Sequence, residues 1–321
     1  MNLSFIDLHS DTASELYYHR KHLDANDLHI SLEKAACYQN YAQIFAVYTP
    51  SRLNDEEGFR AFLKVSDAFS EEISRLSDRI AFVSNEKSLP TIWESHRAAA
   101  FLAVEDARLL AGNPDRLRTL YDRGVRFLTL TWAGETCIGG SWDTNIGLTD
   151  FGIQTVRNCF ELGVIPDVSH ASTQTIDNVI EIAAQYGNPF IATHSNSYAV
   201  YPHRRNLNDN HFKAICKVGG IVGMNMYRNH LSDSSVSPAS IETVVSHIDH
   251  FMELGGENTV VFGCDFDGAD FPDDLADISA ISKIADALLS KNYSEDLVEK
   301  IFWKNAYAFL EKNVFCQPEI K

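Results

Sequence analysis

Short apolar runs alternate with longer amphipathic stretches along this chain. The runs span residues 3–8, 43–48, 99–104, 126–130, 164–168, 190–193, 220–225 and 259–264. Each has the length and composition of a buried strand, and the intervals between them are long enough to hold a helix. Regular alternation of strands and helices predicts an α/β fold with a parallel sheet.

Two of the intervals carry a clear helical period. Apolar residues there recur every three or four positions, as expected for a helix with one buried face. The first set is Phe59, Phe62, Val65, Phe69, Ile73 and Leu76, and the second is Ile241, Val244, Val245, Ile248 and Met252. In a third interval, Ser172 or Thr173 can cap a helix at Gln174, and Gly187 can end that helix before Pro189.

Eight strands with intervening helices predict a (β/α)8 TIM-like barrel. A doubly wound nucleotide-binding sheet is disfavoured, because no GxGxxG follows the first strand. Pro166 lacks a backbone N–H, so we expect a local irregularity near the start of the fifth strand. No linker or repeat divides the chain. We therefore expect a single domain over residues 1–321, with an insertion at about 50–98 and closing helices at about 272–313.

Composition narrows the classes of function. The 321 residues are 45% hydrophobic, which is enough for a large core, and the formal charge of −17 argues against nucleic acid or an anionic membrane as a partner. No charged leader or apolar stretch of spanning length is present, so we expect a cytoplasmic protein.

The six cysteines are scattered without a CxxC pair and are expected to be free thiols. Cys264 is expected to be a buried strand residue rather than a nucleophile, since no paired base is evident.

Residues that commonly bind metals or act as acids follow five of the eight apolar runs. They are His9, Asp11, Glu105, His170, His194 and Asp265. The carboxyl ends of barrel strands meet at one rim, so these side chains are expected to lie together. Imidazoles, an HxD pair and a glutamate would suit two divalent cations.

Each of these residues also has a simpler interpretation. His9 could lie in a turn beside Asp11 acting as a helix cap, Glu105 could cap the next helix, and a lone histidine is often structural. Asp265 lies in CDFDGAD, which superficially resembles a calcium loop. The twelfth position from Asp265 is Ala276 rather than a bidentate glutamate, so that interpretation fails. Five coincident strand ends favour a metal site.

Longer motifs resemble a known family. The segments IDLHSDT, FLAVEDA, RFLTLTW with GLTDFG, IPDVSHAS, ATHSNSYAVYPHRRNLND, GGIVGMNMY and FGCDFDG occur in this order, and SEDLVEKIFWKNAYAFLEK closes the chain. In these segments the chain resembles the membrane (renal) dipeptidases of peptidase family M19. These are binuclear zinc peptidases of the amidohydrolase-type barrel superfamily. The resemblance covers nearly the whole chain.

The resemblance implies a cofactor of two Zn2+ per chain. His9 and Asp11 would bind one ion, His170 and His194 would bind the other, and Glu105 would bridge both. The activity implied is hydrolysis of small dipeptides, including those with a C-terminal D-residue, by a hydroxide between the metals.

Further roles follow from the same resemblance. Asp265 would contact the hydroxide and carry its proton to the leaving amine. Arg205 would stabilise the oxyanion or hold the substrate carboxylate. Asn225 and Tyr227 would line the substrate pocket, with packing at the strand end as the alternative. The sequence leaves open whether a homodimer forms.

One position departs from the family pattern. Animal members carry a substrate-facing histidine in an LTLTH context, whereas this chain has Trp132 in LTLTWAGET. Tryptophan can donate one hydrogen bond from its indole but cannot act as an acid. Trp132 therefore keeps one alternative open beside the dipeptidase, the same chemistry on another small amide such as an N-acyl amino acid or a lactam. A non-catalytic binding barrel is a separate alternative, against which the complete ligand set argues.

Overall fold

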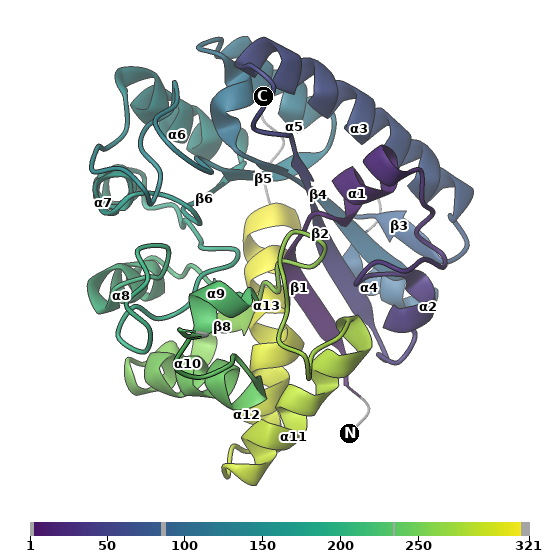
Figure 1. Cartoon of the computed structure of the whole chain (residues 1–321). Helices are drawn as coiled ribbons and strands as arrows, with labels where there is room; N and C mark the ends of the chain where they lie inside the picture. Colours follow the sequence, from purple (N-terminus) through teal and green to yellow (C-terminus); the bar gives the residue numbers. More distant parts are fainter. Residues whose placement is uncertain (1–2, 85–87, 234, 316–321) are drawn as a thin grey trace.

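Parallel strands form one curled sheet with helices around its outside (Figure 1). The computed structural model describes residues 3–84, 88–233 and 235–315. The strands are β1 (Phe5–Ser10), β2 (Tyr41–Tyr48), β3 (Ile80–Phe82), β4 (Ala98–Glu105), β5 (Val125–Thr129), β6 (Ile165–Asp167), β7 (Val222–Met224) and β8 (Val260–Phe262). The predicted α/β class is confirmed.

The strand order is β6-β5-β4-β2-β1-β8-β7, and β3 pairs with β4 beside this path. Residues 190–193, predicted as a strand, form only isolated bridges: Ile191 to β6 and Ala192 to β7. The backbone ladder stops here because the next amide, Thr193 N, donates to the Asp167 carboxylate instead of a backbone carbonyl. The bridges nevertheless connect the two ends of the sheet.

The segment expected as an insertion holds α3 (Asp55–Arg75), β3 and α4 (Leu89–Glu94). The helical period predicted for α3 is correct, since Phe62, Val65, Phe69 and Ile73 are buried along it. Its start is fixed by a capping box between Asn54 and Glu57. Strand β3, which lies within this segment, was not predicted.

The other helices cover the sheet. They are α1 (Thr12–His19), α2 (Leu32–Ala35), α5 (Asp115–Asp122), α6 (Asp150–Leu162), α7 (Thr173–Tyr186), α8 (Asp209–Lys217), α9 (Arg228–Leu231), α10 (Ile241–Glu253), α11 (Ser282–Ser290), α12 (Glu295–Glu299) and α13 (Asn305–Leu310). As predicted, Ser172 caps α7 and Gly187 ends it, with φ +70°. Within the described ranges, no helix has the length and apolarity needed to cross a membrane.

Two apolar clusters form the core, one on each face of the sheet. The outer cluster joins strands to helices, as where Phe45 packs on Phe69 of α3. The inner cluster includes alternate residues of β2 and β4 together with Phe309 and Leu310 of α13, which lies beside β1 in Figure 1. Glu105 comes two residues after Ala103, so its side chain lies on the same inner face, at the carboxyl end of β4. The inner face thus becomes polar where the strands end.

Candidate metal centre

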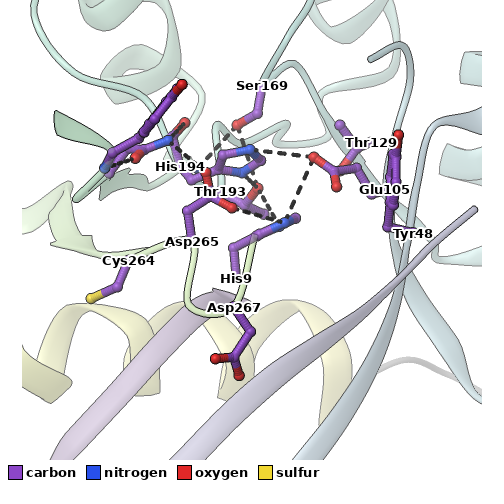
Figure 2. Close-up of polar contacts among 12 residues, drawn as sticks. His9, Tyr48, Glu105, Thr129, Ser169, Thr193, His194, Cys264, Asp265 and Asp267 are labelled. Carbon is purple, nitrogen blue, oxygen red and sulfur yellow. Dashed lines mark hydrogen bonds and ion pairs between the residues drawn. The ribbon is translucent and has the colours of Figure 1, made fainter. Parts of the chain in front are cut away.

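Three imidazoles surround one carboxylate oxygen at the carboxyl ends of the strands. Glu105 Oε1 lies 3.0 Å from His170 Nε2, 3.5 Å from His194 Nε2 and 3.7 Å from His9 Nε2. The Nε2 atoms of His170 and His194 are 2.8 Å apart. Figure 2 shows His9 and His194 both directed at Glu105. Four residues from distant parts of the chain therefore converge on one buried point.

Three groups of donor atoms are close enough to hold a cation, each with its atoms within 4.8 Å of one another. They are His9–Asp11–Glu105, Glu105–His170–His194 and His9–Asp167–His194. The first two correspond to the predicted ligand sets and share Glu105.

The third group contains Asp167, which the sequence did not single out as a site residue. Its Oδ1 accepts hydrogen bonds from the N–H groups of Ser169 and Thr193, at 2.9 and 2.8 Å. Its Oδ2 accepts from the hydroxyls of Thr129 and Thr193, at 2.5 and 2.6 Å. Four donors occupy a carboxylate's four lone-pair sites, so Asp167 supports the centre instead of binding a metal.

The structure weighs against the simpler interpretations of the acidic residues. Asp11 occupies the position before α1, yet its side chain makes no capping hydrogen bond. The turn after β4 is capped by Asp106, not by Glu105. Among the described residues, Asp11 Oδ1 and His9 Nε2 are buried without a hydrogen-bond partner. Buried polar atoms are normally paired, so these two fit a cation, and imidazole nitrogen with carboxylate oxygen suits zinc.

Backbone geometry also marks the site. His170 and Asp265 have φ of 66° and 67°, in the left-handed region that residues other than glycine rarely adopt. Such conformations cost about 1–3 kcal/mol each and concentrate at functional sites. Gly268, missed in the sequence although it belongs to DFDG, has a different role. A Cβ there would lie 2.2 Å from Asp11 Oδ2 and 2.6 Å from Asp265 Oδ1, so glycine leaves room for both carboxylates.

The charges around Glu105 favour an anionic carboxylate beside neutral imidazoles at His170 and His194. Burial alone would raise the pKa of Glu105, but His9 and the hydrogen bonds from His170 and His194 hold it well below its usual range. Burial lowers the pKa of His170 to about 4 and that of His194 well below its usual range. For His9 the opposing charge of Glu105 outweighs burial and raises the pKa to about 10. His170 and His194 are thus in the neutral form that binds a metal, whereas a cation at His9 would displace its proton.

Asp265 approaches the same imidazole nitrogen of His9 as Glu105 does. Its Oδ1 is 4.0 Å from His9 Nε2, and its Oδ2 accepts a hydrogen bond of 3.2 Å from Asn225 Nδ2. Burial raises the pKa of Asp265 to about 6. Its side chain is not solvated, because Asp265 is only 8% exposed. A carboxylate with this pKa is suited to exchange protons near neutral pH.

Arg205 places a buried cation next to the metal centre. Its Nη1 donates to Ser195 Oγ at 2.8 Å and its Nη2 to the backbone oxygen of His194 at 2.9 Å. Burial lowers its pKa to about 10, so it stays charged at neutral pH. These two hydrogen bonds fix the plane of the guanidinium.

The two aromatic residues predicted to bind substrate lie in different surroundings. The Trp132 ring is 5.2 Å from the ring of Tyr48 and 6.3 Å from that of His170. Tyr227 packs edge-on against His230 at 4.6 Å, and its N–H donates to Asn225 Oδ1. Trp132 therefore borders a predicted ligand directly, whereas Tyr227 reaches the centre through Asn225.

Solved structures share this architecture. A metallopeptidase from Rhodobacter sphaeroides, liganded with a phosphinate mimic of the dipeptide L-Ala-D-Ala, has a TM-score of 0.89 and 23% identity, covering 98% of this chain and 100% of that chain. Dipeptidase AC, also a metallopeptidase, has a TM-score of 0.89 and 24% identity over the same shares. An amidohydrolase from Pseudomonas aeruginosa has a TM-score of 0.80 and 19% identity, covering 98% and 97%. The fold is that of the amidohydrolase-type α/β proteins.

The family follows from the sequence. The profile of the membrane dipeptidases (peptidase family M19) matches residues 1–315, and the chain belongs to this family. A Klebsiella pneumoniae protein described as an uncharacterized protein in the pqqA 5′ region is 33% identical over 224 residues, which are 67% of this chain and 81% of that protein. The predicted resemblance is confirmed, and the chain is an enzyme, a metallopeptidase-type hydrolase of dipeptides.

Proposed function

We propose that this enzyme is a zinc-dependent dipeptidase that uses two metal ions sharing Glu105. The observation that carries the proposal is the convergence of three imidazole Nε2 atoms within 3.0–3.7 Å of Glu105 Oε1. A carboxylate shared between two donor sets is the arrangement that a two-metal hydrolytic site needs.

His9 and Asp11 would hold one ion, and His170 and His194 the other. Bound zinc would supply a water with lowered pKa and polarise the scissile carbonyl. In the first set, His9 Nε2 and Asp11 Oδ1 are buried without a hydrogen-bond partner. With Glu105 anionic, the charged ligands partly balance the charge of two dications.

Asp265 is the proton carrier in this proposal. It would accept the proton of the attacking water on Oδ1 and deliver it to the leaving amine. Asn225 holds the other oxygen, Oδ2, so that Oδ1 keeps its direction toward His9. The raised pKa supports both halves of this transfer.

Arg205 would bind the negative charge of the substrate, either the terminal carboxylate or the oxyanion that develops during attack. Its planar guanidinium is already desolvated and oriented by Ser195 and the His194 carbonyl. A fixed cation costs little reorganisation when charge develops, which favours the transition state.

The substrate class is inferred from the family and from the R. sphaeroides structure, whose ligand mimics L-Ala-D-Ala. Small dipeptides, including those with a C-terminal D-residue, are therefore the proposed substrates. Trp132 favours a second candidate, in which the same centre hydrolyses an N-acyl amino acid or a lactam. The indole borders His170, where the animal enzymes have a histidine that contacts substrate.

Turnover assays with added zinc separate the two substrate classes. The panel contains L-Ala-L-Ala, L-Ala-D-Ala, N-acetyl-alanine and a β-lactam, with metal content measured by mass spectrometry. We expect dipeptide turnover and about two zinc ions per chain. Turnover of N-acetyl-alanine without any dipeptide activity would overturn the dipeptidase assignment. A protein that retains far less than about two ions would overturn the binuclear centre.

We also infer that the curled sheet is a (β/α)8 barrel formed by one domain over the whole chain. The seven strands of the main path provide most of the ring. The bridges from Ile191 and Ala192 support an eighth position between β6 and β7.

A further inference from the structure

One buried hydroxyl lies between imidazoles that belong to different proposed metal sets. Thr193 Oγ1 is 2.8 Å from His194 Nδ1 and 3.5 Å from His9 Nδ1. The same oxygen donates to Asp167 Oδ2 at 2.6 Å. Thr193 is 1% exposed, and Figure 2 shows it between His9 and His194.

The hydrogen-bonding capacity of a hydroxyl matches these partners. Thr193 has one hydrogen to donate and two lone pairs to accept. The short contact with Asp167 uses the hydrogen, so both lone pairs face the imidazoles. The Nε2 atoms of His9 and His194 face Glu105 at the proposed metal sites. When Nε2 binds a metal, the ring proton of each histidine lies on Nδ1 and can be donated to Thr193. A longer contact of 3.4 Å joins the hydroxyl to Ser169 Oγ.

Asp167 fixes the direction of this hydroxyl. Its own two oxygens are held by four donors from two strand ends and the 190–193 segment. A carboxylate held in this way cannot rotate without breaking several hydrogen bonds in a water-poor interior, where an unpaired group is costly. The Thr193 hydroxyl hydrogen therefore points at Asp167, and the oxygen lone pairs point at His9 and His194.

We propose that Thr193, oriented by Asp167, is a positioning residue that holds one imidazole of each metal set and thereby couples the binding of the two ions. The proposal rests on the binuclear centre proposed above. It assigns to Thr193 no contact with substrate or metal. The simpler interpretation is a threonine whose hydroxyl satisfies its own hydrogen bonds at a strand end.

Zinc affinity measured by competition with a chelator tests this proposal without any assay of turnover. Thr193→Val keeps the shape of the side chain and removes the hydroxyl, whereas Thr193→Ser keeps the hydroxyl. Loss of a hydrogen-bond partner behind a ligand histidine typically weakens metal binding by about 10–100-fold. We expect Thr193→Val to lose affinity for both ions in this range and Thr193→Ser to remain within about threefold of the wild type.

Thr129→Val is the matched control. The Thr129 hydroxyl donates to the same Asp167 oxygen at 2.5 Å, is equally buried, and makes no hydrogen bond to an imidazole among the described residues. We expect Thr129→Val to lose far less affinity than Thr193→Val. Equal losses in the two valine variants would show a structural role and overturn the proposal, as would a Thr193→Val protein that binds zinc like the wild type.

Absorption spectra of the Co2+-substituted proteins give a second readout, because ligand-field bands respond to the geometry of the imidazoles. We expect shifted bands in Thr193→Val and restored bands in Thr193→Ser; unchanged bands in both would contradict the proposal. Thr193→Ala carries the same test if the valine variant does not fold. A wild-type protein that binds no zinc would overturn the binuclear centre itself, whereas normal loading of Thr193→Val would overturn only this inference.

Discussion

The two halves of the sheet differ in how they place their ligands. In one half, β2 and β4 are each eight residues long and pair in continuous register up to Tyr48 and Glu105. In the other half, β6, β7 and β8 are three residues each, and residues 190–193 form only bridges. The long strands deliver the shared carboxylate by simple alternation. His170, His194, Arg205 and Asp265 all come from the short-strand half.

Buried carboxylates replace the backbone ladder in the short-strand half. Asp7 accepts from the N–H of Cys264 at 2.7 Å, as Asp167 accepts from that of Thr193 at 2.8 Å. Each aspartate takes an amide just before a site residue, Asp265 or His194. Because these side-chain hydrogen bonds end the strand pairing, the backbone that follows forms turns. These turns orient Asp265 and His194. The long-strand half therefore provides the stable frame, and the polar network of the other half sets the geometry of the centre.

The largest effect on catalysis is expected from His194→Ala. This change removes a ligand from the short-strand half and leaves the frame intact, so we expect turnover to be abolished while circular dichroism stays native; His170→Ala should behave alike. His211→Ala is the control, since His211 is also buried but pairs with Asp177 on α7. Near-normal turnover in either ligand variant would contradict the assignment.

Phe45→Ala tests the other half of the comparison. Phe45 is fully buried and packs on Phe69 at 4.8 Å between centroids. Truncating a buried phenylalanine typically costs about 3–5 kcal/mol. Urea unfolding should show this loss in the free energy of unfolding, while the folded fraction still binds zinc. A variant with wild-type stability but impaired metal binding would reverse the roles of the two halves.

Arg205→Lys is expected to lower kcat/KM by about 10²–10³-fold, the range seen when one donor to a developing oxyanion is removed. Lysine cannot reproduce the fixed planar fork that contacts Ser195 Oγ and the His194 carbonyl. Arg204→Lys provides the control on the neighbouring residue, which bonds Thr144 and Asn145 at the surface. Similar losses in both variants would mean that Arg205 acts through general folding of this loop.

The smallest effect is expected from Trp132→His. An imidazole at this position can donate to an oxyanion with more acid character than indole, and one hydrogen bond to a charged group is worth about 1.5–3 kcal/mol. We expect kcat/KM for L-Ala-D-Ala to rise about tenfold relative to that for N-acetyl-alanine. A ratio that does not change would show that Trp132 lies outside the substrate's reach.

The sequence predicts the long-strand half better than the short-strand half. Runs such as 43–48 and 99–104 match β2 and β4 closely, because a buried strand of this length has a clear composition. The predicted ligands converge because strand ends meet at one edge, which follows from topology alone. The run 190–193 was predicted as a strand but forms only bridges. No local signal in the sequence shows that the Asp167 carboxylate accepts the hydrogen bond of Thr193 N–H.

Other features depend on contacts that one sequence cannot show. Asp167 lies in IPDVSH beside His170, yet only its four donors distinguish a supporting aspartate from a metal ligand. Gly268 lies in DFDG, but the need for glycine appears only when Asp11 is found 2.2 Å from its missing Cβ.

The central claim is that two metal ions share Glu105. Anomalous diffraction at the zinc edge, from crystals of the zinc-loaded enzyme, tests it most directly. Our account predicts two peaks, one beside His9 and Asp11 and one beside His170 and His194, with the Glu105 carboxylate between them. A single peak, or two peaks of which only one contacts Glu105, would contradict it.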